Sequence, residues 1–581
     1  MRKLIHWLQA GCKPVSPLSL KIPSVAISLG LSLAVPLYFG LLTLLHARTS
    51  GPIIQDDARL HIVWLQQLID PALFPQDAIA DYYTAIQPLG FQALYGLAAA
   101  LSIAPLLFAK VVPTALALIA TVYLFRVALL IFPVPLSGLL VTLVFNQNIW
   151  LKDDLVSATP RAFVYPLFAA FLYYLLRNMR WLSLLTLGLQ GLFYPQMMLV
   201  SLGLLTLRLL KVRAAKQLQR DIAFWGAALV ITAGLLVLFS HRTAAQVGPL
   251  VSLGDMTTMP EFQADGRREY FGVSPLHFAF AGASGLRFPL FPPIICTGAL
   301  LPLMLRKRWT VPITREVVVL PQLFFSAVAL FLLAHGLFPR LYLPSRYTFY
   351  SLRCLMAIAT GLVLTLLLYW FCWNWRPQER HWKWREGIQV GLSAALAIAV
   401  IVVPAVPAIF LPCHGWVEGE FPGLYGAIAQ TPKETLVASI SPEADNVPAF
   451  AQRSVLVGRE FALPYHSAFY DIMLQRMADL VAAQYSAEVG PLVAFIQTYG
   501  VDLWLVDRQF TEPEYLTQQD WLMRSSIGDQ ITPLALQLAQ GRQPALRQFL
   551  PTCDVFVDDE HILLDTACIV RRAKLGEFAE I

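Results

Sequence analysis

Two pairs of acidic residues stand where hydrophobic stretches of the chain end, and their chemistry makes them the first candidates for a reaction centre. The first pair is Asp56 and Asp57, and the second is Asp153 and Asp154. Paired carboxylates beside apolar helices can accept protons, hold a metal ion or bind sugar hydroxyls, because partial burial and like-charge proximity raise at least one pKa. The alternative is that each pair only caps a helix in contact with water. Two such pairs on one membrane face favour a functional site.

The composition predicts the class of protein. Hydrophobic residues make up 57% of the 581 residues and charged residues only 14%, and the mean hydropathy is +0.59. These values are far from those of a soluble globular chain and predict an α-helical, multi-pass integral membrane protein. The formal net charge is +6, but the basic residues gather in short clusters between apolar runs, as topology determinants do. We therefore expect contact with membrane lipids and no binding of nucleic acid.

Apolar runs of roughly bilayer length predict about eleven transmembrane helices, several of them short or broken by proline. These spans lie near residues 24–46, 108–131, 134–151, 162–176, 181–193, 195–211, 221–240, 288–305, 316–337, 347–373 and 387–411.

One further apolar run, Pro88–Ala109, decides the sidedness of everything that follows it. If this run lies in the plane of the membrane, every cluster of Lys and Arg falls on the cytoplasmic side, whereas a crossing run would misplace every cluster after the first. The clusters are Arg2/Lys3/Lys13/Lys21, Arg177/Arg180, Arg208 to Arg220, Arg306/Lys307/Arg308/Arg315 and Arg376 to Arg385. The in-plane arrangement is therefore expected. It places residues 47–107, 150–161, 241–287 and the C-terminal region outside the cytoplasm, with both acidic pairs on one face.

The first outer segment is predicted to contain two surface helices, of which the Pro88–Ala109 run is the second. In the first, Leu60, Trp64 and Leu68 recur at helical spacing, so Asp56 stands at the N-terminus of a short amphipathic helix. The long polar loop at 241–287 leaves two interpretations open, a lid over a substrate or a disordered segment.

The order of these features resembles the GT-C superfamily of membrane glycosyltransferases, which includes oligosaccharyltransferase catalytic subunits, protein O-mannosyltransferases and aminoarabinose transferases. The features are one span, an acidic pair at the head of an outer helix, an in-plane helix and a second acidic loop after the third span. The stretch Asp56-Asp57-Ala58-Arg59-Leu60 resembles the Asp-Glu-x-Arg-Tyr stretch of the aminoarabinose group. The resemblance implies that Asp56 is the catalytic carboxylate, although its neighbour here is Asp57 rather than Glu.

The second acidic loop is similar in position to that of the superfamily, in which the acid often falls where this chain has Thr159 or Arg161. Whether Asp153 or Asp154 corresponds to it stays open. Residues 424–456 resemble, more weakly, the start of the outer domain of oligosaccharyltransferase subunits. That domain carries a Trp-Trp-Asp motif that this chain lacks, so we do not expect N-glycosylation of protein sequons.

The resemblance implies a glycosyltransferase with a polyprenyl-phosphate-linked sugar as donor and a glycan, lipid or protein as acceptor. Asp56 would act as the general base toward an acceptor hydroxyl, and Asp57, Asp153 and Asp154 would complete the acidic site. If Asp56 and Asp154 converge, a divalent cation such as Mg²⁺ or Mn²⁺ could bind between them, because hard cations take oxygen ligands. Some members of the superfamily need a metal ion and others do not, so no metal is assigned.

Basic side chains near the outer face are candidates for binding the carrier phosphate, whose charge grows as the glycosidic bond breaks. The candidates are Arg59, Lys152, Arg161, Arg340, Arg346 and Arg353. Arg346 stands at the outer mouth of a span, where a guanidinium group could bind phosphate in a bidentate manner or could simply reach toward the interface. Arg161 could instead pair with Asp153 or Asp154.

Polar residues return after the last span and predict an extracytoplasmic α/β domain at 412–581, following a transmembrane domain at 1–411. Strands are predicted at 435–440, 454–457 and 501–506, and helices at 467–484 and 491–499. The last of these strands is apolar on both faces, as a central strand would be. Cys553 and Cys568 flank a possible hairpin and predict a disulfide in an oxidising compartment, with Cys413 as a competing partner.

Two other classes of function remain open, a transporter or flippase of an envelope precursor and a non-catalytic envelope scaffold. Transporters place ionisable residues near the middle of the membrane and often contain inverted repeats. Here the acids stand at the outer ends of spans and no repeat is evident. The enzyme is therefore favoured, in a bacterial plasma membrane with the C-terminal domain outside the cytoplasm.

Overall fold

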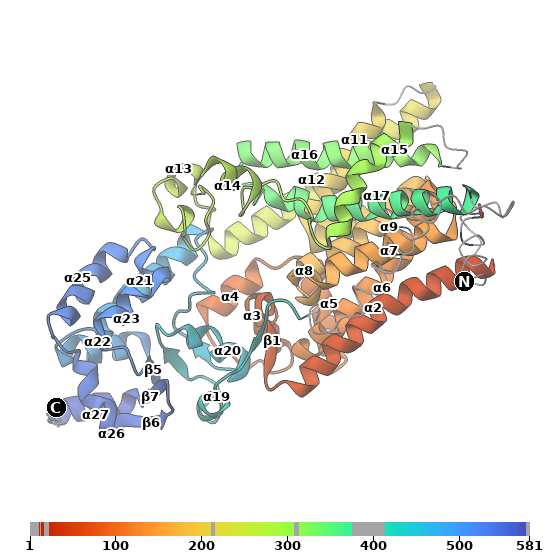
Figure 1. The fold of residues 1–581 in the computed structure, drawn as a ribbon. Coiled ribbons are helices and arrows are strands. Elements are labelled where there is room, and N and C mark those ends of the chain that lie inside the picture. Colours follow the sequence, from red (N-terminus) through yellow and green to blue (C-terminus); the bar gives the residue numbers. More distant parts are fainter. Residues whose placement is uncertain are drawn as a thin grey trace.

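The computed structural model shows a bundle of long helices with an α/β region at one end (Figure 1). It describes the residues 11, 13–16, 22–210, 215–272, 274–306, 313–374, 395 and 413–576.

Ten of the eleven predicted spans coincide with helices of the bundle. They are α2 (Pro23–Thr49), α6 (Pro105–Ile131), α7 (Pro135–Trp150), α9 (Val164–Leu176), α10 (Arg180–Phe193), α11 (Pro195–Leu209), α12 (Ala215–Val247), η4 and α15 (Pro293–Leu300 and Leu301–Arg306), α16 (Val319–Gly336), which follows η5 (Arg315–Val318), and α17 (Ser345–Asn374). Five of the described helices are long and apolar enough to cross a membrane. The eleventh predicted span, 387–411, falls almost entirely outside the described residues, so the count of eleven stays a prediction.

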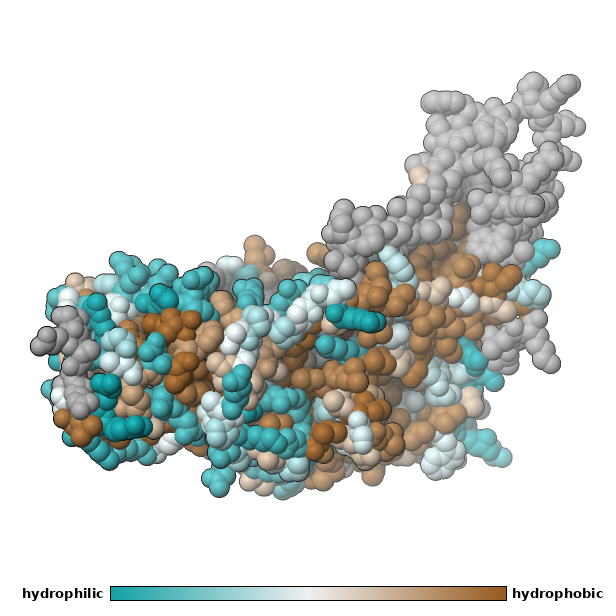
Figure 2. Space-filling model, turned by 90° about the horizontal axis from the view of Figure 1, so that it is seen from below, coloured by the Kyte–Doolittle hydropathy of each residue, from teal (hydrophilic) through white to brown (hydrophobic). Residues whose placement is uncertain are grey.

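The bundle exposes apolar side chains on its outer surface. Leu41 of α2, Phe325 and Leu332 of α16 and Leu107 of α6 are each more than half exposed. In a soluble protein such a surface would be unfavourable, whereas lipid tails solvate it. Figure 2 shows hydrophobic side chains covering the helical half of the molecule and hydrophilic ones gathering on the other half. The protein is therefore an integral membrane protein.

Between α2 and α6 the first outer segment forms four helical elements, whereas the sequence predicted two surface helices. They are α3 (Asp56–His61), η1 (Val63–Leu68), α4 (Ala78–Ala85) and α5 (Leu89–Ala100). The prediction of one helix over Pro88–Ala109 was wrong in its extent. Ser102 adopts a φ of 61°, in the left-handed region, and the chain re-enters a helix at Pro105. A left-handed residue ends a helix and proline at the first helical position starts one, so the run divides into α5 and the first turns of α6.

The 241–287 loop is ordered and packs against the C-terminal region, so the alternative of a disordered segment was wrong. Helix α12 continues to Val247, and the loop then forms α13 (Leu253–Met256), η3 (Pro260–Phe262) and α14 (Pro275–Phe280). Glu261 is buried and accepts hydrogen bonds from the Tyr470 hydroxyl at 2.7 Å and the Ser526 amide at 2.6 Å. Arg267 forms an ion pair with Glu460 at 2.6 Å.

The C-terminal region, residues 413–576, contains a five-stranded mixed sheet in the order β4-β3-β5-β7-β6. Its strands are β3 (Leu436–Ala438), β4 (Ser454–Val455), β5 (Leu503–Asp507), β6 (Asp554–Val557) and β7 (His561–Asp565). Strand β5 is central, as predicted, and pairs parallel with β3 and antiparallel with β7. The surrounding helices are α19 (Pro422–Ala429), η7 (Pro442–Asp445), α20 (Val447–Phe450), α21 (Ser467–Gln484), α22 (Val489–Tyr499), α23 (Pro513–Thr517), α24 (Asp520–Met523), α25 (Gly528–Ala539), η8 (Ala545–Phe549), α26 (Leu550–Cys553) and α27 (Thr566–Leu575).

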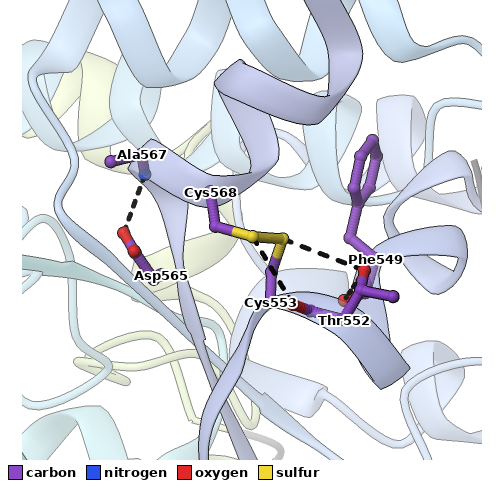
Figure 3. Close-up of a disulfide and its surroundings, with 6 residues drawn as sticks. All are labelled: Phe549, Thr552, Cys553, Asp565, Ala567 and Cys568. Atoms are coloured by element: carbon purple, nitrogen blue, oxygen red, sulfur yellow. Dashed lines mark hydrogen bonds between the residues drawn. A yellow bond between two sulfur atoms is a disulfide. The ribbon is translucent and has the colours of Figure 1, made fainter. Parts of the chain in front are cut away.

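The predicted disulfide is present and joins Cys553, at the end of α26, to Cys568 in α27 (Figure 3). The competing partner, Cys413, is a free thiol. The bond encloses the β6–β7 hairpin and ties it to the last helix.

A two-stranded antiparallel ribbon connects the C-terminal region to the first outer segment. Strand β1 (Ile53–Gln55) pairs with β2 (Trp416–Glu418), with Gln55 opposite Trp416. The residue after β1 is Asp56, whose backbone amide donates a hydrogen bond to the Gly415 carbonyl at 2.7 Å. The start of the C-terminal region is therefore held directly against the first acidic pair.

Candidate active site

The first acidic pair occupies the first turn of α3, but neither side chain caps the helix. The N-cap residue is Gln55, and no side chain accepts a capping hydrogen bond there. Instead, the Asp56 carboxylate forms an ion pair with Arg59, one turn further along α3. The side chain of Asp56 is 47% exposed, so one face of this carboxylate remains open to a substrate.

Arg161 joins the two acidic loops. Its guanidinium group forms an ion pair with Asp57, contacts Asp153 at 3.1 Å and lies 3.8 Å from Asp154. Arg161 belongs to η2 (Pro160–Phe163), and the second acidic pair begins the short helix α8 (Asp153–Val156). Its side chain is only 13% exposed, so its charge is largely withdrawn from water and depends on these carboxylates. The sequence left open whether Arg161 binds phosphate or pairs with the second acidic loop. The structure shows the pairing.

Asp154 is completely buried and is held from two sides. The Tyr165 hydroxyl donates a hydrogen bond to its Oδ2 atom at 3.0 Å, and Arg353 of α17 forms an ion pair with the same atom. Arg353 also donates to the Tyr165 hydroxyl at 2.8 Å and lies over the ring of Phe349 at 3.7 Å. Neither Asp154 nor Arg353 presents a surface to a ligand. The expectation that Arg353 binds phosphate was therefore wrong, because its charge is used to hold α8 against α17.

Gly415 closes the space between the two acidic loops. It has a φ of +71°, and a Cβ atom on it would lie 3.7 Å from the Asp153 Cβ and 4.0 Å from the Asp56 Cβ. Asp56 and Asp153 are therefore near neighbours, as the sequence predicted for the two acidic loops. A left-handed backbone with this little space favours glycine.

The C-terminal region also fixes Arg59. Its guanidinium group donates a hydrogen bond to the Asn446 Oδ1 atom at 2.7 Å, across 387 residues of sequence. The Asn446 amide in turn donates to both oxygens of Glu443 at 3.0 and 3.2 Å, and Glu443 accepts from the Tyr425 hydroxyl. This chain of contacts holds Arg59, and hence its partner Asp56, in one orientation.

A basic and aromatic cluster, formed by Arg346, Arg287, Lys152, Tyr194 and Tyr350, lies beside the acidic loops. The Arg346 guanidinium donates to the Tyr350 hydroxyl at 3.5 Å, and the ring of Tyr350 packs edge-on against Tyr194. The charge of Arg287 interacts with those of Arg346 and Asp153, and that of Lys152 with Asp153 and Arg287. Burial lowers the pKa of the Lys152 ammonium group. Among the described residues, no carboxylate forms an ion pair with Arg346, which leaves its charge for a ligand.

Three other predicted ligands have different surroundings. Arg340 is exposed in the turn between α16 and α17. Arg59 and Arg161 each bind carboxylates of the site, so their charges are already compensated.

The side chains do not fit a divalent cation between Asp56 and Asp154, a site that the sequence left open. The Arg161 guanidinium lies among the carboxylates where a cation would stand, and Asp154 already accepts from Arg353 and Tyr165. In the described part of the chain, no group of three or more His, Cys, Asp or Glu residues is placed to hold a metal ion. No step of the proposed chemistry is therefore assigned to a metal.

The arrangement of a transmembrane bundle, an acidic first outer segment and a C-terminal α/β region is similar to the fold of a solved archaeal oligosaccharyltransferase, and the resemblance to the GT-C superfamily implied such a fold. The oligosaccharyltransferase of Archaeoglobus fulgidus, solved with zinc and sulfate, superposes with a TM-score of 0.50 at 12% identity, over 87% of this chain and 70% of that one. Mycobacterial arabinofuranosyltransferase AftD gives a TM-score of 0.48 at 13% identity, over 85% of this chain and 37% of that one. The archaeal enzyme AglB, in complex with an inhibitory peptide and a dolichol-phosphate, gives 0.43 at 14% identity, over 87% and 72%. No family model and no curated protein sequence matches this chain.

Several residues of the site were not predicted from the sequence. Tyr165, Arg287, Gly415 and Asn446 all contact or face the acidic loops, yet each lies in a stretch whose pattern only indicates a helix or a loop. Gly415 alone carries a local signal, because glycine beside a polar turn often marks a left-handed residue.

Proposed function

We propose that the protein is a membrane glycosyltransferase that transfers a sugar from a polyprenyl-phosphate carrier to an acceptor hydroxyl at the extracytoplasmic face. The observation that supports this most strongly is the junction at Arg161, which brings both acidic loops together beside the half-exposed Asp56 carboxylate. The basic cluster around Arg346 lies next to that junction. A general base and an anion site side by side are what transfer from a phosphate leaving group requires.

Asp56 is the general base in this proposal. Asp57 and Asp153 share Arg161, and Asp154 is buried, so their role is to hold the loops together rather than to contact the acceptor. Asp56 keeps an open face, and the Arg59–Asn446 contact orients it. The acceptor hydroxyl would give its proton to Asp56 as its oxygen attacks the anomeric carbon.

Arg346 is the proposed ligand of the carrier phosphate, with Lys152 and Arg287 beside it. A guanidinium group without a carboxylate partner can bind two phosphate oxygens and stabilise the charge that grows on the leaving group. Tyr194 and Tyr350 provide hydroxyl groups on the same side of the site. The carrier's apolar tail would lie among the bundle helices or in lipid.

The proposed sidedness rests on basic residues at the helix ends that lie far from the acidic loops. Arg208 of α11 forms an ion pair with Glu316 at 3.1 Å, and Arg180 of α10 pairs with Asp221 of α12 at 2.8 Å. These basic residues lie at the ends of the helices that are remote from the acidic loops, which is the expected distribution if the basic end faces the cytoplasm. A disulfide in the C-terminal region fits an oxidising compartment.

The test is turnover of a labelled polyprenyl-phosphate sugar by the full-length protein in vesicles, with envelope extract as the source of acceptor. Asp56→Asn should lower turnover by roughly 10² to 10⁴-fold, because a general base contributes that much. Asp81→Asn, which changes an exposed carboxylate of the same outer segment, should have no effect. Unchanged turnover in Asp56→Asn would overturn the assignment. Movement of the donor across the vesicle membrane without cleavage would favour a transporter.

A further inference from the structure

A cavity lies beside the residue that precedes Asp56. Its volume is about 210 Å³, and it lies between strand β1, the first turns of α6 and the C-terminal region. Its lining includes Gln55, which precedes the proposed base, and Ser157, which stands three residues after the buried Asp154. This cavity therefore lies beside both acidic loops, and its lining includes none of the residues of the basic and aromatic cluster.

Some polar side-chain atoms at this cavity have no hydrogen-bond partner within the protein. Gln55 is only 4% exposed, and neither its amide nitrogen nor its carbonyl oxygen has a hydrogen-bond partner. The indole nitrogen of Trp416 is likewise buried without a partner. Gln55 and Trp416 are directly opposite in the β1–β2 ribbon, so their side chains share one face. Buried polar groups are normally satisfied, and a donor–acceptor pair beside a free N–H is what sugar hydroxyls can satisfy.

Lys110 supplies a positive charge at the same cavity. It stands in the second turn of α6, and no described carboxylate forms an ion pair with it. Its neighbours Leu107 and Val111 are 57% and 48% exposed on the lipid-facing side of the helix. In the proposed orientation, the first turns of α6 lie at the boundary between lipid tails and head groups, and Lys110 stands there next to a cavity that also has apolar walls from Leu106 and Ala109.

On the basis of the proposed function, we infer that this cavity is the acceptor subsite and that it binds the sugar ring of a lipid-anchored acceptor with an anionic linkage. Gln55 and the Trp416 indole bind ring hydroxyls, and Lys110 binds the anionic group that connects the ring to its lipid. The volume is below the roughly 300–1,000 Å³ of sites for drug-sized ligands, so it suits one ring rather than a folded peptide. The lipid anchor would lie along the exposed face of α6.

The reaction balances with both substrates in place. A bond forms between the acceptor oxygen and the anomeric carbon of the donor sugar, and the bond from that carbon to the carrier phosphate breaks. The electron pair of the broken bond stays on the phosphate, which leaves as polyprenyl phosphate beside Arg346. The hydroxyl proton goes to Asp56.

The test uses the same vesicle assay, with the envelope extract separated into lipid, water-soluble glycan and protein fractions as acceptor sources. Label should pass only to the lipid fraction, and the product should partition into organic solvent. Gln55→Leu and Lys110→Gln should each raise the acceptor concentration at half-maximal rate by about tenfold, because each loses one polar contact, while the KM for the donor stays unchanged. Arg48→Gln, which removes an exposed charge at the outer end of α2, is the matched control.

The outcomes separate the two proposals. If transfer depends on Asp56 but label passes to soluble glycan or protein, the acceptor inference is overturned and the glycosyltransferase stands. The same holds if both variants keep the wild-type acceptor dependence. Thermal unfolding of Gln55→Leu shows whether this variant still folds. If it does not fold, Lys110→Gln, a change at the surface of α6, still tests the inference. If Asp56→Asn retains full turnover, the proposed function itself fails.

Discussion

Asp57 of the first outer segment and Arg161 of the second acidic loop form an ion pair, and the same guanidinium group contacts Asp153 at 3.1 Å. One arginine therefore holds two distant stretches of the chain together at one end of the bundle. Because the Arg161 side chain is only 13% exposed, its removal would leave carboxylates close together and poorly solvated.

We expect Arg161→Ala to destabilise the protein by about 3–5 kcal/mol, the usual cost of breaking a buried ion pair by removing one partner. Turnover should also be lost, because the acidic loops separate. Arg340→Ala removes an exposed arginine and should change neither property. Thermal unfolding in detergent and the vesicle assay measure both. A variant as stable and active as wild type would show that the junction is not structural.

Asn446 is expected to act as a positioning residue through Arg59. Asn446→Ala removes the 2.7 Å hydrogen bond to Arg59 and should lower kcat by about 10 to 10²-fold, with the donor KM unchanged, since misplacement of a catalytic group has costs of this size. Lys433→Ala breaks a different contact between the two regions, the exposed ion pair with Asp70, and serves as the control. Equal losses in both variants would indicate a general loosening of the interface.

Arg346→Gln should raise the KM for the donor by about 10 to 10²-fold, because a charge-assisted hydrogen bond contributes about 1.5–3 kcal/mol. Arg346→Lys should recover part of the loss, since lysine supplies the charge without the bidentate geometry. The measurement is donor dependence of the initial rate in vesicles. If the exposed Arg340→Gln variant shows the larger increase, the phosphate site lies in the turn before α17 instead.

Stability should depend on pH through Asp445. Burial, and to a lesser degree Glu460, raise its pKa from 3.8 to about 7, while Arg59 and Arg267 lower it. The folded protein therefore keeps a proton that the unfolded chain loses above about pH 4. Its contribution to stability is complete below that pH and is lost as the pH rises to about 7, by about 1.4 kcal/mol for each pH unit.

Asp445→Asn keeps the oxygen that accepts from the Glu460 amide at 3.0 Å, but it cannot ionise. The melting temperature of this variant should exceed that of wild type at pH 8 and match it at pH 4. Asp81→Asn should follow wild type at both values. A constant difference between Asp445→Asn and wild type at all pH values would contradict the assigned pKa.

Removal of the disulfide should loosen the end of the C-terminal region. Cys553 and Cys568 are 15 residues apart, and closing a loop of this length contributes about 3 kcal/mol. The double variant Cys553→Ser/Cys568→Ser should therefore unfold at lower temperature. Cys413→Ser changes a free thiol and is the control. Equal melting of the double variant and wild type would show that this hairpin does not limit unfolding.

Local patterns in the sequence determined the class of protein, the positions of most helices of the bundle and three of the five strands of the sheet. Helix α21 runs over Ser467–Gln484 as predicted, and β5 is central because its residues are apolar on both faces. The position of the acidic pairs at the ends of apolar runs also followed from hydrophobic run lengths. The break at Ser102 was missed, because no propensity rule demands a left-handed serine there.

The partners of the charged side chains were decided only by the tertiary structure. Arg161 reaches Asp57, Arg353 reaches Asp154 across 199 residues, and Arg59 reaches Asn446 across 387. Periodicity reports which face of a helix is apolar, but ion pairs and hydrogen bonds depend on how helices far apart in the chain pack together. The sequence therefore determined where the charged residues stand, and the packing decided their partners and left Asp56 the most exposed carboxylate of the two acidic pairs.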